Sequence, residues 1–259
     1  CEAEERDRSN GKRGAYGIPA SGPLAYCGLM GVCAALDEAR CNFTEDQLLN
    51  APIANNLRAG DWLIQCLVDR LVDMPGLEQV GDWLRRAAQI LAGCPRTLAP
   101  FYFDLLVPGL CAAASNCLLE GSSDFIAVSS YSSDLIRNLA LATAQFWGAT
   151  KSAPLHWDRA QTEGWHKLPS LCAGLPHFSA GFMRNWGRDT FISLRGCLLV
   201  TGHFQEARDT LLVYANVVRH GLCPNLLDAA NRPRYNARDA TWFFMQAIQD
   251  YVAESPEGE

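Results

Sequence analysis

The sequence lacks four features, and each absence excludes a class of protein or site. No run of Lys and Arg residues occurs in the 259 residues and the formal net charge is -6, so a nucleic-acid backbone is not expected as a partner. The apolar run at residues 105–119 is too short and too rich in Ala, Ser, Asn and Cys to cross a membrane. No His or Cys residues have the spacing of a metal-binding pair, so neither a metal nor another cofactor is expected. Alternating patterns typical of strands are also nearly absent.

The cysteines indicate a reducing environment. The chain has 11 of them, an odd number, and most lie in apolar helical patterns, so we interpret them as buried reduced thiols. Reduced thiols predict a cytoplasmic protein, in which the Asn42-Phe43-Thr44 triplet would not serve as a glycosylation site. The chain starts at Cys1 with a charged segment that is neither a signal peptide nor an initiator-Met start, so we expect a piece of a longer chain.

Apolar residues recur at three- and four-residue intervals through most of the chain, which predicts an almost all-helical protein. With 49% hydrophobic residues, the chain can bury a large core and forms one domain or part of one. The expected helices are joined by short polar loops and span residues 24–39, 61–73, 77–91, 100–119, 134–146, 188–200, 204–220 and 238–252. His220 and Gly221 are expected to end the helix that starts at Phe204. Residues 151–176 break the pattern and are predicted to form a long irregular loop, which is usually functional or disordered.

Two predicted helix starts carry charged and aromatic residues together. The first has Arg184, Trp186, Arg188 and Asp189, and the second has Arg234, Tyr235, Asn236, Arg238, Asp239 and Trp242. Burying such charges at the start of an apolar helix costs free energy unless they form ion pairs or bind a ligand. A carboxylate, a guanidinium and an aromatic side chain together can bind a polyhydroxylated ring such as a sugar. The charged groups form hydrogen bonds with the hydroxyls, and the aromatic side chain packs against the apolar face of the sugar.

A structural explanation of the two Arg-Asp pairs stays open at this point. Each pair can be an ion pair that orients the start of a helix. A neighbouring guanidinium lowers the pKa of a carboxyl group, so Asp189 and Asp239 are suited to accept hydroxyls or act as a base and not to act as a general acid. Asp and Trp also meet at a third helix start, Asp61-Trp62, which favours a solenoid or closed toroid with one common rim over an ordinary bundle.

Several long segments resemble the glucosidase half of eukaryotic glycogen debranching enzymes. The most specific are GLPHFSAGFMRNWGRDTFISLRGCLLVTG at 174–202, HGLCPNLL at 220–227 and RPRYNARDATWFF at 232–244. The likeness extends upstream to RGAYGIP at 13–19, NNLRAGDWLIQCLVDRL at 55–71 and FYFD at 101–104, so it covers nearly the whole chain.

The resemblance implies an all-α fold, an (α/α)6 toroid of the glucoamylase-like type that is incomplete in this chain. It assigns residues 1–259 to the N-terminal and central part of the glucosidase domain. The implied activity of the parent enzyme is hydrolysis, with inversion, of the α-1,6-linked glucose at glycogen branch stubs, with a 4-α-glucanotransferase site elsewhere in the parent. The implied partner is glycogen or another branched α-glucan.

The resemblance also implies the roles of site residues. Trp186, Arg188 and Asp189 occupy a Trp-x-Arg-Asp motif that holds the terminal glucose. The residues implied to border the same pocket are Arg234, Tyr235, Asn236, Arg238 and Asp239, with His177 and Asn225 as further candidates. The family's general acid, in a Thr-Trp-Met-Asp motif, and its Glu base do not occur in these residues and are expected C-terminal of Glu259.

Inverting hydrolysis needs two carboxyl groups, so we expect no catalytic residue in residues 1–259 and no activity from this chain alone. Two other readings stay open: a glucan-binding pseudoenzyme and a helical interaction scaffold without sugar chemistry.

Overall fold

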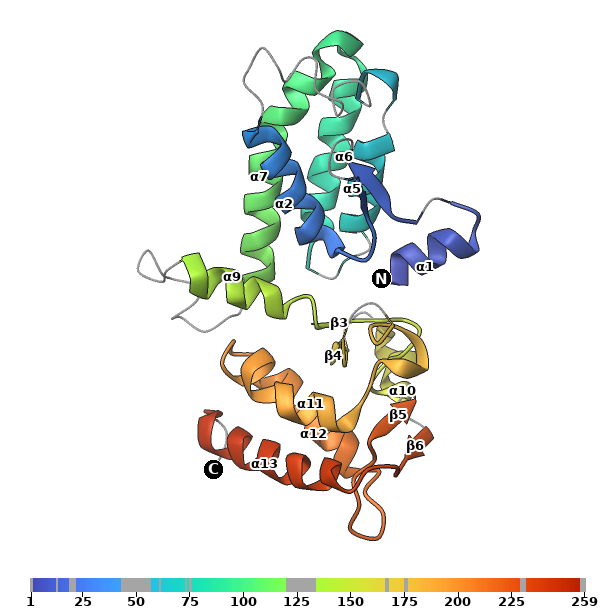
Figure 1. Cartoon of the computed structure of the whole chain (residues 1–259), viewed down its shortest axis with the longest axis vertical. Coiled ribbons are helices and arrows are strands. Elements are labelled where there is room, and N and C mark those ends of the chain that lie inside the picture. The colour runs from blue at the N-terminus through green and yellow to red at the C-terminus, as the bar shows by residue number, and fades with distance from the viewer. Residues whose placement is uncertain are drawn as a thin grey trace. The chain divides into compact units, whose positions relative to one another are not determined.

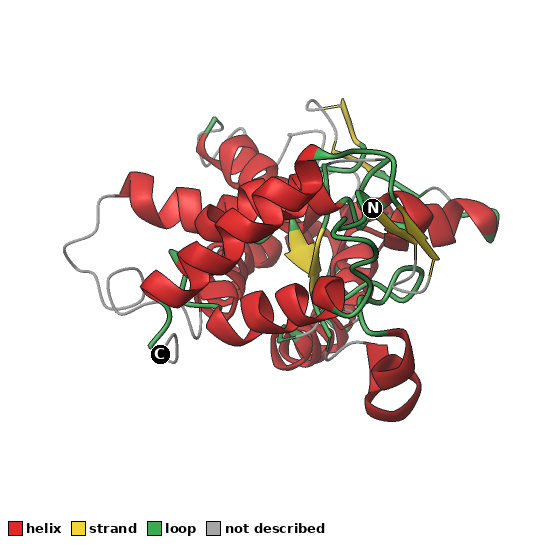
Figure 2. Cartoon of the chain, turned by 90° about the horizontal axis from the view of Figure 1, so that it is seen from below, coloured by secondary structure: helices red, strands yellow, loops and turns green. Residues whose placement is uncertain are grey.

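A computed structural model describes most of the chain, and its residues group into two compact units, residues 3–118 and 119–259. The described residues are 2–12, 14–18, 22–42, 57–60, 62–72, 74, 76–119, 134–165, 168–174, 177–228 and 232–256. Helices dominate both units and the strands are short, as the ribbon drawings show (Figures 1 and 2). The expected all-α class is therefore confirmed at the level of a mainly helical protein.

The first unit consists of helices and one hairpin. Helix α1 (Glu2–Ser9) opens the chain and was not expected from the sequence. The other elements of this unit are β1 (Tyr16–Ile18), β2 (Gly22–Leu24), α2 (Gly28–Cys41), α5 (Trp62–Val72), α6 (Glu78–Ala92), η1 (Arg96–Leu98) and α7 (Ala99–Leu119). Strands β1 and β2 are antiparallel and place Tyr16 opposite Leu24.

The core of the first unit is formed by one face of each long helix. Helix α5 contributes Leu63, Leu67 and Leu71, which are at most 2% exposed, and α6 packs beside it. The two helices approach closely at Gly81, where an added Cβ would lie 2.7 Å from a methyl carbon of Val72 and 2.9 Å from its backbone nitrogen. Glycine at this position therefore allows the close packing of α5 and α6.

Helix α7 joins the same core through Phe103, Val107, Leu110 and Ala114. By length and mean hydropathy alone, the helical stretch Arg96–Leu119 is also long and apolar enough to cross a membrane. A single helix of this kind is weak evidence of a membrane span, and four side chains of α7 are buried in the core of the first unit.

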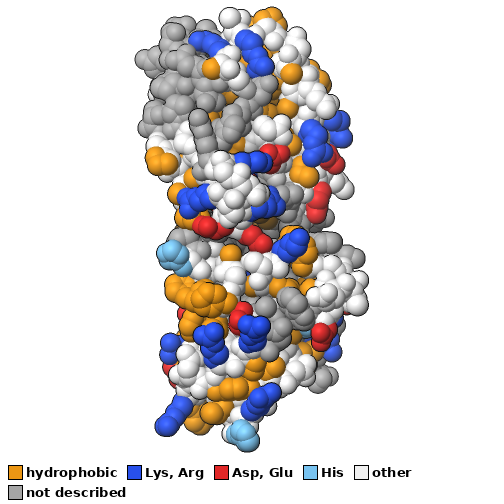
Figure 3. Space-filling view, turned by 90° about the vertical axis from the view of Figure 1, so that its right-hand side faces the viewer, with side chains coloured by type: hydrophobic (Ala, Val, Ile, Leu, Met, Phe, Trp, Pro, Cys, Tyr) orange, Lys and Arg blue, Asp and Glu red, His pale blue; other side chains and the backbone are white. Residues whose placement is uncertain are grey.

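The second unit contains several helices, of which α11, α12 and α13 pack together, and several short elements. Its elements are α9 (Asp134–Thr143), β3 (Trp147–Gly148), α10 (Trp157–Arg159), η2 (Ala160–Gly164), β4 (Ser170–Leu171), η4 (Gly181–Met183), α11 (Gly187–Leu194), η5 (Arg195–Leu199), α12 (Phe204–Ala215), β5 (Leu226–Asp228), β6 (Arg232–Arg234) and α13 (Asp239–Glu254). Strand β3 pairs with β4 and β5 pairs with β6, both antiparallel. On the face in Figure 3, basic, acidic and apolar side chains lie interspersed.

Helices α11 and α13 lie side by side and run in the same direction. Arg188 at the start of α11 pairs with Asp239 at the start of α13, and Arg195 in η5 pairs with Glu254 at the end of α13. Helix α12 contacts α13 and contributes Ala207, Leu211 and Tyr214 to the core of this unit. The parallel arrangement brings the two charged helix starts together.

Each of the eight expected helices has a counterpart, and three details differ. The helix expected to reach His220 ends at Ala215, because residues 219–222 form a tight turn with φ of 51° at His220 and 75° at Gly221. The stretch 151–176, expected to be irregular, contains α10, η2 and β4 among its described residues. The expected helix 188–200 is an α-helix only to Leu194 and continues as a π-helical turn. Asp61, in the third Asp-Trp start, lies outside the described residues.

Candidate functional site

The candidate site is built where three segments of the second unit meet at the start of α11. The amide of Leu227 donates to the carbonyl of Asn185 at 2.9 Å, and the amide of Gly187 donates to the carbonyl of Asn225 at 2.7 Å. Strand β6 continues the arrangement, since the amide of Asn225 donates to the carbonyl of Arg234 at 2.9 Å. These bonds join the two segments in which the sequence predicted sugar-binding residues.

Asn225 connects these segments and is only 3% exposed. Its side-chain Oδ1 accepts a hydrogen bond from the backbone amide of Arg188 at 3.2 Å, in the first turn of α11. Amides in the first turn of a helix have no partner inside the helix, so Asn225 acts as a cap supplied by a distant segment. The structure therefore gives Asn225, predicted as a substrate ligand, a positioning role at the helix start.

Gly187 lets the segment that carries Asn225 approach the helix. An added Cβ at this position would lie 2.3 Å from the carbonyl oxygen of Pro224 and 3.3 Å from ring atoms of Phe191 and Tyr214. A backbone oxygen cannot move away as a flexible side chain can, so only glycine fits without displacing the segment. The glycine of the Trp-x-Arg-Asp motif is thus required by packing.

An ion pair between Arg188 and Asp239 joins the two helix starts, with 2.8 Å between the guanidinium nitrogen and the carboxylate oxygen. The two side chains are 43% and 46% exposed, so this charged pair faces solvent. The hydrogen bond from Arg188 lowers the pKa of Asp239 below its ordinary value, and the first amides of α13 add to the effect. The sequence predicted a lowered pKa from the neighbour Arg238, whereas the structure assigns the effect to Arg188 on another helix.

Asp189 and Trp186 lie beside this ion pair. Asp189 is partly exposed in the first turn of α11 and forms no ion pair with any residue that the structure describes. Trp186 precedes the helix in an extended conformation, and its ring contacts Phe178 edge-on with 6.3 Å between centroids. The carboxylate of Asp189 is therefore available to a ligand.

Three buried polar atoms near the start of α11 have no hydrogen-bond partner in the described part of the chain. They are Nε1 of Trp186 and both amide atoms of the Asn185 side chain, which is 2% exposed. Buried polar groups in proteins almost always have partners, and ordered water is a common one. Sequence reasoning did not select Asn185, although it lies inside the motif between Arg184 and Trp186.

The remaining residues predicted to bind the substrate differ in their contacts and exposure. The hydroxyl of Tyr235 donates to the carbonyl of Val217 at 2.5 Å and so fixes the loop after β6 to the segment after α12. The side chains that are exposed around the same helix starts are those of His177, Arg234, Asn236 and Arg238. The structure thus brings Trp186, Arg188 and Asp239 together, gives Tyr235 a structural bond, and leaves the four exposed residues at the edge.

Arg184 has a different role from the charges around it. It is 4% exposed and donates to Ser170 Oγ at 2.7 Å, to the carbonyl of Ser170 at 2.5 Å, to that of Ser179 at 2.6 Å and to that of Gly148 at 2.9 Å. Burial lowers the pKa of its guanidinium, and the charges of Cys172 and Glu2 act in the opposite direction. Arg184 therefore ties the segment before α11 to the β3–β4 hairpin, because carbonyl dipoles satisfy its donors.

No group of three or more His, Cys, Asp or Glu side chains among the described residues is arranged to hold a metal ion. The polar atoms at the two helix starts are amide, indole, guanidinium and carboxylate groups, which both donate and accept hydrogen bonds. This set is suited to a neutral ligand with many hydroxyls.

Comparison with known proteins identifies the family. A model of the amylo-alpha-1,6-glucosidase family matches residues 141–259, and a model of the central domain of human glycogen debranching enzyme matches residues 1–71. The assignment of all of residues 1–259 to the glucosidase domain stays a prediction. A glycogen debranching enzyme of Saccharomyces cerevisiae is 42% identical over 261 aligned residues, which cover 100% of this chain and 16% of the relative. The motifs, their geometry and these matches together show that the chain belongs to the glycogen debranching enzyme family.

Proposed function

We propose that the paired starts of α11 and α13 bind the α-1,6-linked glucose at a branch stub of glycogen, as part of an amylo-α-1,6-glucosidase that acts with inversion in glycogen catabolism. The observation that carries the proposal is the set of groups at this place. The Arg188–Asp239 ion pair lies at the two helix starts, together with the carboxylate of Asp189 and Nε1 of Trp186, which have no ion-pair or hydrogen-bond partner among the described residues. Charged groups that bind hydroxyls, next to an indole ring, are typical of a glucose site.

The proposed fold around the site is an (α/α)6 toroid of the glucoamylase-like type, of which this chain forms a part. Two features support it. Helices α11 and α13 are parallel and α12 connects them, which is the arrangement of alternate helices in such a toroid. Helix α13 also exposes an apolar stripe, with Trp242 at 69%, Met245 at 51% and Val252 at 55% exposure, which a further helix would cover.

The chemistry of the proposed reaction requires groups in addition to these. An inverting glycosidase needs a protonated carboxyl group that donates its proton to the leaving oxygen and an ionised carboxyl group that activates the attacking water. The two groups lie about 6.5–9.5 Å apart. With its pKa held low by Arg188, Asp239 is not suited to the acid role. We therefore propose that both catalytic carboxyl groups, and a separate 4-α-glucanotransferase site, belong to parts of the enzyme outside residues 1–259.

We also propose that the protein works in the cytoplasm. The cysteines that the structure describes are all free, including the exposed Cys41. A reducing compartment keeps such thiols free and contains the glycogen that the proposed site would bind.

The proposal is tested by variants in a full-length debranching enzyme that carries these residues. Arg188→Met and Asp189→Asn should each lower glucose release from branched limit dextrin roughly ten- to hundredfold, because a charge-assisted contact contributes about 1.5–3 kcal/mol. Transferase activity should stay nearly unchanged. Arg208→Met is the matched control, since Arg208 is an exposed residue of α12 away from the two helix starts.

Hydrogen exchange distinguishes the remaining readings. Amides at the starts of α11 and α13 should exchange more slowly when a branched oligosaccharide is added. Glucose release within twofold of wild type in both variants would refute the proposed role of the two residues. Protection without glucose release by the full-length enzyme would indicate a glucan-binding pseudoenzyme, and no protection would indicate a scaffold without sugar chemistry.

A further inference from the structure

One face of helix α7 is exposed in this chain and carries no charge. Helix α7 is 21 residues long, and Asp104 is the one charged residue in it. Its exposed residues recur at three- and four-residue intervals, which places them on one face of the helix. We define the outer face of α7 as Leu98 in the preceding turn together with Phe101, Tyr102, Leu105, Pro108 and Ala112.

The large side chains of the outer face are far from buried. Leu105 is 62% exposed, Phe101 is 49% exposed and Leu98 is 42% exposed. The rings of Phe101 and Tyr102 contact each other edge-on, with 5.8 Å between their centroids. Proteins rarely leave a contiguous apolar patch in water, and such a patch usually marks an interface.

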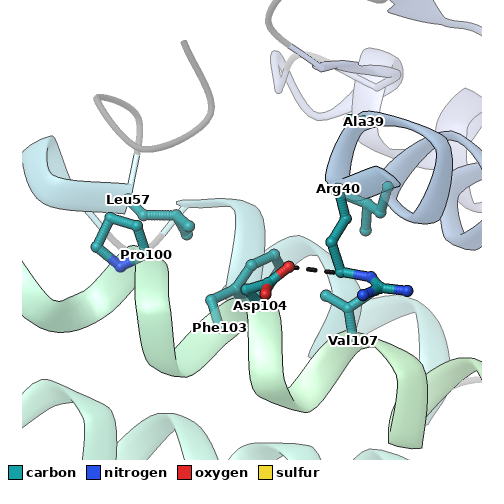
Figure 4. Close-up of a pocket in the computed structure, with 8 residues that line it drawn as sticks. Ala39, Arg40, Leu57, Pro100, Phe103, Asp104 and Val107 are labelled. Carbon is teal, nitrogen blue, oxygen red and sulfur yellow. Dashed lines mark ion pairs between the residues drawn. The ribbon is translucent and has the colours of Figure 1, made fainter. Parts of the chain in front are cut away.

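The inner face of α7 is already occupied. Phe103 and Val107 are buried in the core of the first unit. Beside them, the carboxylate of Asp104 lies 3.9 Å from the guanidinium of Arg40 on α2, and both residues line an open hollow of about 340 Å³ (Figure 4). The single charge of α7 is therefore directed to α2, and the outer face is left with apolar groups.

Helix α6 of the same unit has the opposite character on its exposed side. Its exposed residues include Glu78, Asp82, Arg85 and Arg86, and Asp82 pairs with Arg85. A helix with one apolar and one charged face is stable at a protein surface, whereas a helix that is apolar on all sides is normally buried in a large protein or a membrane. Because α7 packs its inner face into a protein core, we expect protein to cover its outer face as well.

The size of the family member indicates which protein covers this face. Residues 1–259 correspond to 16% of the Saccharomyces cerevisiae relative, so most of such a polypeptide lies outside this chain. A segment of the same polypeptide is present at a high effective concentration, which favours it over a separate molecule. A glucan fits poorly, because sugars bind through hydrogen bonds and the outer face has one polar side-chain group, the hydroxyl of Tyr102.

We propose that the outer face of α7 is an interface within the debranching enzyme, on which an apolar helix from outside residues 1–259 packs. The shape of the face suits a helix. Large side chains at Phe101 and Leu105 are followed by the small residues Gly109 and Ala112, and an added Cβ at Gly109 would meet no atom within 4 Å. A second helix can approach closely at such small residues. The inference is independent of glucan binding, because it concerns the first unit only.

The test places the photo-cross-linker p-benzoylphenylalanine at Leu105 in a full-length debranching enzyme that carries these residues. Irradiation and peptide mapping should reveal a cross-link, within one polypeptide, to a peptide outside residues 1–259. The same cross-linker at Ile90 is the matched control. Ile90 is 72% exposed and lies one turn from Arg86 on the charged side of α6, so it should give little cross-linked product.

Hydroxyl-radical labelling of the wild-type enzyme measures the same burial without a substitution. Leu105 should be labelled roughly tenfold more slowly than its 62% exposure predicts, because a fully buried side chain is about 95% covered. The proposal is overturned if Leu105 is labelled at the rate that its exposure predicts, or if protection appears only when branched oligosaccharide is added. It is also overturned if the cross-link joins two copies of the enzyme or two peptides within residues 1–259.

Discussion

Replacing Gly187 by alanine should destabilise the second unit and open the candidate site at the same time. The added Cβ would lie 2.3 Å from the carbonyl oxygen of Pro224, whereas a carbon and a carbonyl oxygen need about 3.3 Å. The segment that carries Asn225 must therefore move by about 1 Å. This shift breaks the 2.7 Å bond between the Gly187 amide and the Asn225 carbonyl.

The expected cost has two parts. Overpacking a tight site costs about 1–3 kcal/mol, and the lost hydrogen bond costs about 1 kcal/mol more. Together they give about 2–4 kcal/mol, a large fraction of the stability of an ordinary domain. With a typical dependence on urea, the midpoint of the second unit should fall by on the order of 1 M.

Urea unfolding of the chain, followed by tryptophan fluorescence, measures this shift, and Gly196→Ala is the matched control. Gly196 lies in η5 on the continuation of the same helix, and an added Cβ there would meet no atom within 4 Å. Alanine should therefore be neutral or slightly stabilising at this position. Equal midpoints for the two variants would refute the reasoning that close packing makes glycine necessary in the motif.

Three further predictions concern charges of the second unit. Arg184→Lys should lower the free energy of unfolding, measured in urea, by about 3 kcal/mol, because lysine cannot replace the planar guanidinium and leaves buried carbonyl groups unpaired. The control Arg208→Lys, on the surface, should change the free energy of unfolding by less than about 0.5 kcal/mol. Similar losses in both variants would contradict the structural role of Arg184. Arg188→Met should raise the pKa of Asp239 toward its ordinary value in a carbon-13 NMR titration, and Arg238→Met should not. The pKa of Asp239 is lower in the folded than in the unfolded chain, so its ionised carboxylate stabilises the fold above the unfolded pKa, and this stabilisation is lost as the pH falls. The Asp239→Asn variant lacks this carboxylate. It should therefore lose less stability than wild type between about pH 5 and pH 3. A larger effect of Arg238→Met would show that the sequence neighbour is the true partner.

The sequence was a good guide to local structure. The intervals between apolar residues predicted the helices from Glu78 to Ala92 and from Ala99 to Leu119 to within one residue at each end. It did not predict α1, because its charged residues have no apolar face that would indicate a helix. The sequence also predicted that the helix α12 ends at His220, because a glycine after a cation is typical of a helix end. In the structure the helix ends earlier, at Ala215, and the chain turns at His220 and Gly221.

The sequence also located the candidate site but not its internal connections. Charged and aromatic residues at two helix starts predicted a sugar-binding site there, because such charges are costly unless they are paired or bind a ligand, and the sugar-binding role stays a prediction. It suggested that each Asp pairs with the Arg before it, whereas Asp239 pairs with Arg188 at a separation of 51 residues. It grouped Arg184 with Arg188 and Asp189 at the first helix start, whereas the structure buries Arg184 against the β3–β4 hairpin.

By itself, the sequence determined the helical class, the positions of the helices and the two segments that form the site. These properties depend on the period of apolar residues and on the residue types near a helix start, which are local in the chain. Only the tertiary structure decided that Asn225 caps α11, that Gly187 permits this contact, and that Arg188 binds Asp239. Hydrogen bonds and ion pairs act over about 3–4 Å and depend on direction, so their partners follow from the path of the folded chain and not from spacing along the sequence.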